Sequence, residues 1–289
     1  MNKKNILVTG SDGQLGVCIQ TLKFKDPNYI FCFKNKKQLD ILDNQKLNQT
    51  IDENNIKIII NCAAYTNVED CKKNKIIANK INNLSVENIA RICSKKNIQL
   101  IHISTDYVFD GEKNHPYGTD DSTKPINYYG LTKKMGEDAI LKFKLKNSII
   151  IRTSWLYSAY SKNFVYRIFK SLKESNKVDI VGNQIGSPTY AMDLASLIIN
   201  ILPKIKSEDT QVYHYSNLGY CSRYEFALKI KSFFNLKGEI VKKIIKNTQI
   251  KRPKFSALCS EKIKNKFDLS INDWETSLKR CIFQDDFKI

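Results

Sequence analysis

Short apolar runs alternate with helix-patterned stretches through the first half of this chain, and this alternation limits its fold more than any other feature. Between the third and fourth runs, Val86, Ile89, Ala90 and Cys93 recur at helical spacing. Continuous runs of isoleucine and valine are typical of parallel strands that are covered on both faces. The sequence therefore predicts an α/β fold with a doubly wound parallel sheet. Its predicted strands are residues 5–9, 29–33, 57–62, 99–104 and 148–152.

A glycine-rich segment, Gly10-Ser11-Asp12-Gly13-Gln14-Leu15-Gly16, follows the first predicted strand directly and leads into a helix. Glycine permits a tight turn and lets the backbone approach a pyrophosphate, which binds at the helix N-terminus. A G-x-x-G-x-x-G pattern at this position of an α/β chain predicts a Rossmann-like dinucleotide site. The residues expected to contact the cofactor here are Gly10, Asp12, Gly13, Gln14, Leu15 and Gly16.

The second predicted strand ends in lysines and carries no carboxylate. An acid at this point would bind the ribose 2′-hydroxyl and select NAD. Lys34 or Lys36 can pair with a 2′-phosphate instead, which favours NADPH over NADH, although ordinary surface lysines explain the pattern equally well. Later residues are expected near the adenine, and small residues after the third strand would let the cofactor cross the strand ends. These further contacts are Lys34, Asp40, Ile41, Ala63, Ala64 and Tyr65.

The pattern becomes mixed after about residue 153, and no repeat or low-complexity linker separates the two halves. Helices are predicted at 162–174, 193–202, 223–234 and 274–281, with a short tail after the last, and strand-like pieces at 178–181 and 212–216. We therefore expect a dinucleotide-binding domain at 1–152. A smaller mixed α/β substrate-binding region is expected at 153–289, partly interleaved with the first.

Tyr129 and Lys133 are four residues apart and would share one face of a helix. A lysine cation favours the phenolate, so we expect it to lower the pKa of Tyr129 from about 10 toward the range of a general acid. The residue four positions after Tyr128 is Thr132, which makes Tyr129 the predicted proton donor. Thr105, at the end of the fourth strand, supplies a nearby hydroxyl.

The composition argues against several other classes of protein. The net charge of +18 comes mainly from lysines spread along the whole chain, which indicates a solvated surface and not a nucleic-acid face. No apolar run approaches the roughly 18–20 residues that span a bilayer, and the N-terminus does not resemble a signal peptide, so a cytoplasmic location is expected. The eight cysteines form no C-x-x-C pair and the three histidines have no metal-ligand spacing.

With these motifs the chain resembles the extended short-chain dehydrogenase/reductase family and, within it, the dTDP-4-dehydrorhamnose reductases, over nearly its whole length. The resemblance implies reduction by NADPH (or NADH) of the 4-keto group of dTDP-4-dehydro-6-deoxy-L-mannose to dTDP-L-rhamnose, for surface polysaccharide. It is carried by residues 10–16, 39–41, 61–66, 104–111, 129–133, 152–157 and 184–189, with Glu137, Arg252, Pro253, Ser256 and Leu258.

The resemblance also implies roles for individual residues. Tyr129 would donate the proton, Lys133 would support it and hold the nicotinamide ribose, and Thr105 would bind the reacting oxygen. Asp106 and Tyr107 would place the sugar. Trp155 would pack on the sugar ring and Arg252 would bind the diphosphate, although a core tryptophan and a surface arginine remain alternatives for these two.

Departures from the family pattern limit what is carried over. Some members hold Mg²⁺ between subunits, but the matching positions here read Val-Cys-Ile at 17–19 and Ala-Met-Asp at 191–193, so no metal is predicted. A monomer or a homodimer both fit. Tyr107 stands where dehydratases keep a glutamate, which argues against elimination. The alternatives are a reductase or epimerase of another 4-keto sugar nucleotide, or a non-catalytic regulatory subunit that binds one.

Overall fold

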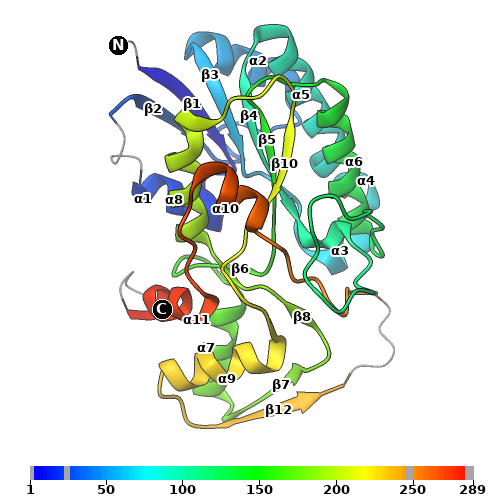
Figure 1. Cartoon of the computed structure of the whole chain (residues 1–289), viewed down its shortest axis with the longest axis vertical. Coiled ribbons are helices and arrows are strands. Elements are labelled where there is room, and N and C mark those ends of the chain that lie inside the picture. Colours follow the sequence, from blue (N-terminus) through cyan, green and yellow to red (C-terminus); the bar gives the residue numbers. More distant parts are fainter. Residues whose placement is uncertain (1–2, 23–26, 245–249, 284–289) are drawn as a thin grey trace.

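The computed structural model describes residues 3–22, 27–244 and 250–283, and a six-stranded sheet forms its centre. All neighbouring strands in this sheet are parallel, in the order β10-β5-β4-β3-β1-β2 (Figure 1). The predicted doubly wound sheet and its five strands are confirmed. The strands are β1 Lys4–Thr9, β2 Tyr29–Lys34, β3 Ile56–Asn61, β4 Gln99–Thr105, β5 Ile149–Thr153 and β10 Gln211–His214.

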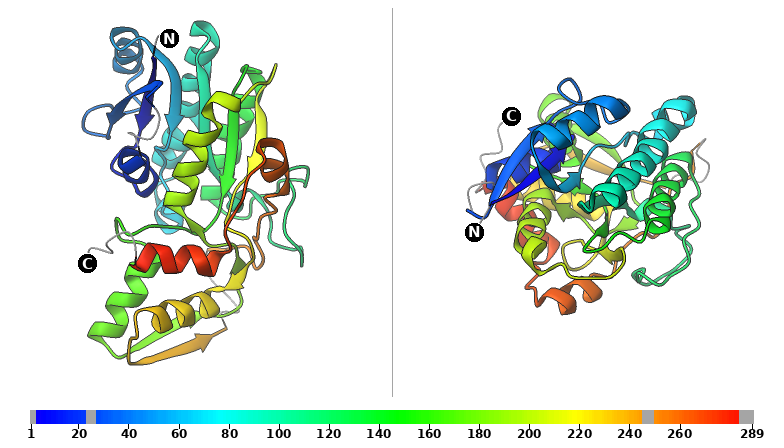
Figure 2. Two further views of the ribbon diagram at one scale, coloured as in Figure 1. Left: turned by 60° about the vertical axis from the view of Figure 1, so that its left-hand side comes forward. Right: turned by 90° about the horizontal axis from the view of Figure 1, so that it is seen from above.

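Helices cover both faces of the sheet because alternate strand residues point to opposite sides. Ile6 and Val8 pack in a cluster with α1 (Gln14–Leu22) and α8 (Ala191–Ile201), whereas Leu7 packs in a second cluster on the other face. The second face carries α2 (Asn44–Glu53), α5 (Ser85–Lys96) and α6 (Tyr128–Lys142), as the view from above shows (Figure 2). Helix α5 contains the four residues of the predicted helical pattern, and all four are buried.

Short helical elements connect β3 to α5 and β4 to α6. They are α3 Val68–Lys73, α4 Lys75–Asn79, the π-helical turn η2 Lys80–Leu84 and the 3₁₀ turn η3 Asp106–Val108. Within η2, the buried Asn82 accepts from Tyr65 N at 2.8 Å and donates to Thr132 Oγ1 at 3.1 Å. This side chain therefore ties the loop after β3 to helix α6.

The later part of the chain forms a smaller lobe below the sheet (Figure 1). In it α7 (Phe164–Glu174) and α9 (Arg223–Phe233) pack beside a parallel pair, β7 (Lys177–Val181) and β12 (Glu239–Lys243). The remaining elements are β6 Leu156–Tyr157, β8 Ile185–Gly186, β9 Thr189–Tyr190, η4 Leu202–Lys204, β11 Cys221–Ser222, α10 Glu261–Phe267 and α11 Trp274–Phe283.

The division at residue 152 stays a prediction. The central sheet takes β10 from beyond that residue, and α8 packs against α1, so the two parts share one core. The predicted helix at 274–281 is confirmed as α11, and the tail predicted after it lies outside the described residues.

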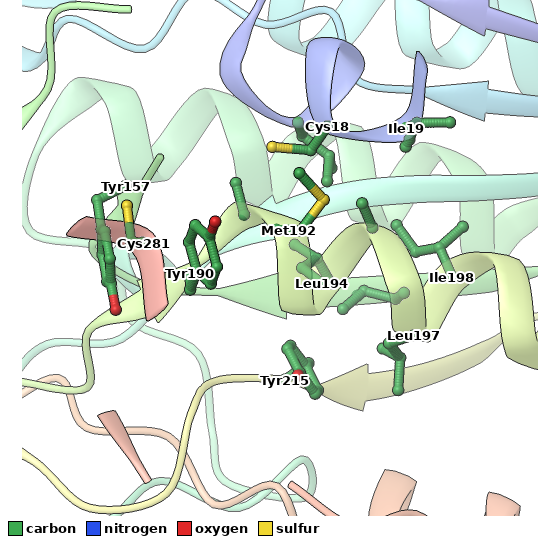
Figure 3. Packing of buried hydrophobic residues seen from close by; sticks show 14 of the residues in the cluster. Cys18, Ile19, Tyr157, Tyr190, Met192, Leu194, Leu197, Ile198, Tyr215 and Cys281 are labelled. Atoms are coloured by element: carbon green, nitrogen blue, oxygen red, sulfur yellow. The ribbon is translucent and has the colours of Figure 1, made fainter. Parts of the chain in front are cut away.

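The positions that match magnesium ligands in the family are core residues here. Cys18 of α1 and Met192 of α8 are 0% and 6% exposed, and Figure 3 shows them among the buried side chains between these two helices. Within the described ranges no three His, Cys, Asp or Glu side chains are grouped to hold a metal ion. The eight cysteines form no disulfide. No helix in the described part of the chain is long and apolar enough to cross a membrane.

Candidate active site

The glycine loop joins β1 to α1 at the carboxyl edge of the sheet. Gly10 has a φ of +61°, and a Cβ there would come within 2.8 Å of the Ala63 backbone, so this position requires glycine. The N-terminus of α1 at Gln14 faces the loop, which is the arrangement that suits a phosphate. The Gln14 side chain accepts from Ser158 Oγ at 3.1 Å and donates to Leu156 O at 3.3 Å. Gln14 thus fixes the loop to the chain that follows β5.

A cleft of about 500 Å³ opens beside this loop and is lined by both halves of the chain. Of the predicted cofactor contacts, those that line it are Gly10, Gly13, Gln14, Leu15, Gly16, Ala64, Tyr129 and Lys133. Ser104 and Thr153 also line this cleft, and their hydroxyls are buried without a hydrogen-bond partner among the described residues. Such orphaned polar groups are consistent with a polar ligand in the cleft.

Six predicted cofactor contacts lie outside the lining of this cleft: Asp12, Lys34, Asp40, Ile41, Ala63 and Tyr65. Lys34 ends β2 beside the glycine loop, where its carbonyl accepts from Ser11 N at 3.3 Å. Asp40 accepts from Leu42 N at 3.0 Å in a turn, and Ile41 is 5% exposed within the core. The side chain of Ile41 therefore packs in the hydrophobic core.

Thr105, Tyr129 and Lys133 come together at the ends of β4 and the start of α6, and all three line the cleft. Asn127 caps α6 by accepting from Gly130 N at 2.9 Å. A Cβ on Gly130 would lie 2.0 Å from Tyr107 O, so the glycine lets α6 pack directly on the turn after β4. The rings of Tyr107 and Tyr129 meet edge to face, with centroids 5.7 Å apart. The local structure thus brings together the three residues that the sequence singles out.

The pKa of Tyr129 moves in the direction opposite to the one expected from the sequence. Burial raises it above the ordinary value of 10, while a hydrogen bond with Thr105 opposes the rise. The expected lowering of this pKa by Lys133 is wrong for this structure, because burial of the phenol outweighs the interactions that oppose it. Lys133 Nζ donates to Ile103 O at 2.7 Å and lies 3.2 Å from His102 Nε2.

Burial also shifts the ionisation of the neighbouring groups. The pKa of Lys133 falls to about 8 because burial disfavours its charge, with Glu137 and Cys62 opposing the fall. The pKa of Asp106 rises to about 6 for the same reason, with hydrogen bonds from Ser256 and Thr105 limiting the rise. Groups with such shifted pKa values in a cleft mark a candidate functional site.

A second, larger cleft of about 1040 Å³ lies between the sheet and the small lobe, and Tyr107 and Arg223 line both clefts. Arg252, which was predicted to bind the diphosphate, lines this cleft, but its guanidinium is paired with Glu69. Arg167 and Arg223 also line this cleft and form no ion pair with a described carboxylate. Arg223 was not among the residues predicted from the sequence, since nothing in its neighbourhood on the chain distinguishes it from a surface arginine at a helix start.

Trp155, which was predicted to pack on the sugar ring, lines the smaller cleft, but one face of its indole is already covered. The guanidinium of Arg223 lies 3.5 Å from the ring centroid. Gly186 lies against the ring as well, because a Cβ there would come within 2.5 Å of it. Trp155 has a φ of +46°, an uncommon value for a bulky residue that is worth attention in a binding site.

Comparison with known proteins identifies the family. The model of the RmlD substrate binding domain family matches residues 4–286. The chain belongs to this family. A dTDP-4-dehydrorhamnose reductase of Aggregatibacter actinomycetemcomitans is 33% identical over 290 residues, covering 95% of this chain and 97% of the relative. The spore coat polysaccharide biosynthesis protein SpsK of Bacillus subtilis is 37% identical over 238 residues, covering 82% and 81%.

Solved structures agree with this assignment. The crystal structure of a dTDP-4-dehydrorhamnose reductase from Bacillus anthracis, in complex with NADP, superposes with a TM-score of 0.90 at 35% identity. It covers 96% of this chain and 98% of the other. The resemblance deduced from the motifs is therefore confirmed at the level of the RmlD family.

One buried ion pair supports the site in this RmlD-family chain. Glu137 lies one turn after Lys133 on α6 and is 0% exposed. Arg152 of β5 donates to both of its carboxylate oxygens, with Nη2 at 2.7 Å from Oε2 and Nε at 3.0 Å from Oε1. This bidentate pair joins α6 to the sheet next to the cleft.

We expect Glu137→Gln to lower the free energy of unfolding by about 3 kcal/mol, because it leaves the Arg152 charge buried without its partner. Asp138→Asn is a matched control on the next residue, which pairs with Lys134 at a half-exposed position and should cost less than about 1 kcal/mol. Urea denaturation at pH 7 measures both. Equal losses in the two variants would contradict a supporting role for the buried pair.

Proposed function

We propose that this protein is an NADPH-dependent reductase that converts the 4-keto group of dTDP-4-dehydro-6-deoxy-L-mannose to the hydroxyl of dTDP-L-rhamnose. The observation that carries the proposal is the convergence of Thr105, Tyr129 and Lys133 on a cleft beside the glycine loop. Full-length similarity to named dTDP-4-dehydrorhamnose reductases supports the same reaction. A dTDP-sugar is accordingly the proposed substrate.

The residues of the smaller cleft fit a nicotinamide dinucleotide. The loop from Gly10 to Gly16 and the N-terminus of α1 would hold its pyrophosphate, and Lys34 beside the loop would face a 2′-phosphate. Lys133 would hold the nicotinamide ribose. The bound cofactor supplies a hydride to the carbonyl carbon, and the protein supplies everything else.

Tyr129 is the proposed proton donor. Burial raises its pKa, so the phenol keeps its proton at neutral pH and has one to give when charge develops on the substrate oxygen. Thr105, which hydrogen-bonds with Tyr129, would hold that same oxygen. The Lys133 cation one helical turn away would stabilise the phenolate that remains. Proximity and orientation in the cleft then supply much of the acceleration.

Tyr107 favours reduction over elimination. Dehydratases keep an Asp-Glu pair after the threonine, but here Asp106 is followed by Tyr107, which packs edge to face on Tyr129. Burial and the charge of Asp106 raise the pKa of Tyr107, so it stays a neutral phenol. Asp106 lies close by and would bind sugar hydroxyls together with Tyr107.

The larger cleft is the proposed site of the nucleoside diphosphate. Arg223 connects the two clefts and stacks on Trp155, so it can reach the diphosphate while the sugar lies near Tyr129. Burial lowers the pKa of Arg223 to about 10, which still leaves it charged at neutral pH. An arginine fork suits phosphate oxygens, and Arg167 adds a second one. Arg252 would contribute less than predicted because Glu69 already neutralises it.

Cytoplasmic location stays a proposal, as does the oligomeric state, for which a monomer and a homodimer both remain. The positions that could bridge subunits through a metal are occupied by the buried Cys18 and Met192, so no bridging metal is proposed.

The direct test is incubation of the protein with dTDP-glucose, the dehydratase and epimerase that act before it, and NADPH. We expect stoichiometric oxidation of NADPH and formation of dTDP-L-rhamnose, identified by NMR. A product with another configuration at carbon 4 would assign a different reductase. Turnover without net oxidation of NADPH would contradict reduction and indicate an epimerase.

Tyr129→Phe should reduce kcat by about 100- to 10,000-fold, because it removes the proton donor and leaves the ring. NADPH binding, measured by fluorescence titration, should change little. Tyr128→Phe is the matched control, since the neighbouring phenol lies outside the lining of the cleft. Near-normal turnover of Tyr129→Phe would contradict the assignment of this residue.

Arg223→Ala should raise KM for the sugar nucleotide by about tenfold or more, because a charged hydrogen bond to phosphate is lost. KM for NADPH should stay within about twofold. Arg91→Ala removes an exposed arginine from α5, far from the lining of either cleft, and should change neither constant. An unchanged KM for the sugar nucleotide in Arg223→Ala would remove this residue from the diphosphate site.

A further inference from the structure

Three buried polar side chains cross the sheet and end at Lys133. Thr9 Oγ1 donates to Asn61 Oδ1 at 2.7 Å, and Asn61 Nδ2 lies 3.1 Å from His102 Nδ1. The other ring nitrogen, His102 Nε2, lies 3.2 Å from Lys133 Nζ. None of the four residues is more than 1% exposed. We refer to Thr9, Asn61 and His102 as the polar rung.

The polar rung follows from the register of three parallel strands. Thr9 of β1 lies opposite Asn61 of β3, which in turn lies opposite His102 of β4. Alternation places all three on the face that α5 and α6 cover, which is where Lys133 stands. The inward positions just before them on the same strands are apolar: Leu7, Ile59 and Leu100. Polarity thus begins two residues further along the same face of each strand.

The contacts of Lys133 leave one of its hydrogens for the cleft. An ammonium has three donors and no acceptor. One N–H donates to Ile103 O at 2.7 Å, and a second can donate to His102 Nε2, 3.2 Å away, when the ring carries its proton on Nδ1. The third can point only to the cleft that Lys133 lines. The contact with His102 therefore fixes the direction of the third N–H of Lys133.

The direction of the hydrogen bonds along the rung is tied to the charge of Lys133. A neutral imidazole offers one donor and one acceptor. An ammonium needs His102 Nε2 as acceptor, which puts the ring proton on Nδ1 and calls for an oxygen of Asn61 opposite it. The Asn61 amide now turns its Nδ2 to His102, which suits an uncharged lysine. Rotating this amide by half a turn exchanges its oxygen and nitrogen and suits the ammonium.

We propose that His102 is a positioning residue for Lys133, and that Thr9 and Asn61 set the direction of its hydrogen bonds, so that the charged lysine keeps one N–H for the cofactor ribose. This inference rests on the proposed function, which gives Lys133 its role. The histidine is suited to the task because burial and the lysine cation lower its pKa well below the usual value, which keeps the ring neutral.

The other titratable groups near Lys133 do not replace His102 as an acceptor for its ammonium. Glu137 raises the pKa of Lys133, but its carboxylate is held by Arg152. Cys62 also faces the lysine, and burial raises the pKa of this thiol to about 12, so it stays neutral. Lys133, with a pKa of about 8, is charged below that pH and loses its charge above it. Removing an acceptor of the charged form moves this transition to lower pH.

Two variants of His102 separate its two contacts. In His102→Gln the amide oxygen can occupy the place of Nε2 and accept from Lys133, whereas in His102→Asn the amide reaches only the place of Nδ1. We expect the alkaline limb of the pH profile of kcat/KM to move down by about one pH unit or more in His102→Asn. It should stay near the wild-type position in His102→Gln. Thermal unfolding checks that both variants are folded, and a limb at the same pH in all three proteins overturns the proposal.

A measurement on the wild-type protein tests the rung without turnover. The chain has three histidines, so ¹⁵N NMR can resolve the ring nitrogens of His102 once His102→Gln identifies its signals. At pH 7 we expect a neutral ring with its proton on Nδ1. A proton on Nε2, or a doubly protonated ring, overturns the proposal. Failure of the enzyme to reduce any 4-keto sugar nucleotide would instead contradict the proposed function and leaves this spectrum as the test of the rung.

Discussion

The parallel register of β1, β3 and β4 is the constraint on which the rest of the site depends. It aligns the ends of three strands so that Gly10, the loop after Asn61 and the hydroxyl of Thr105 meet at one edge. Parallel strands place their carboxyl ends together, which is why ligands of open α/β sheets bind there. A slip by one residue would turn the polar rung toward α1 and α8 and expose apolar side chains to Lys133.

Desolvation governs the chemistry of this edge more than ion pairing does. Burial is the largest cause of the rise in the pKa of Tyr129 and of the fall in the pKa of Lys133, because it disfavours the charged form of each group. A resting site of this kind keeps the proton on the phenol. The polar rung then matters because it offers the lysine cation a second acceptor inside the protein, beside Ile103 O.

Much of this arrangement could be predicted from the sequence, because it depends on local patterns. The strands, the glycine loop and the choice of Tyr129 over Tyr128 follow from alternation, turn chemistry and helical register. The direction of the Tyr129 pKa shift could not be predicted, since it depends on how deeply the folded chain buries the phenol. Arg223 was missed for the same reason: only tertiary packing brings it to the cleft.

Trp155 shows how the two parts of the chain are joined at the site. It lies between the end of β5 and the start of β6, where the chain leaves the sheet for the small lobe, and its φ of +46° makes that turn possible. A left-handed tryptophan is unfavourable by itself, so packing must hold it. Arg223 supplies this packing from α9 in the small lobe, at 3.5 Å from the ring. The same guanidinium lines both clefts. An anion that binds Arg223 would therefore hold the guanidinium on the indole, and with it the turn after β5 and the contact between the sheet and the small lobe.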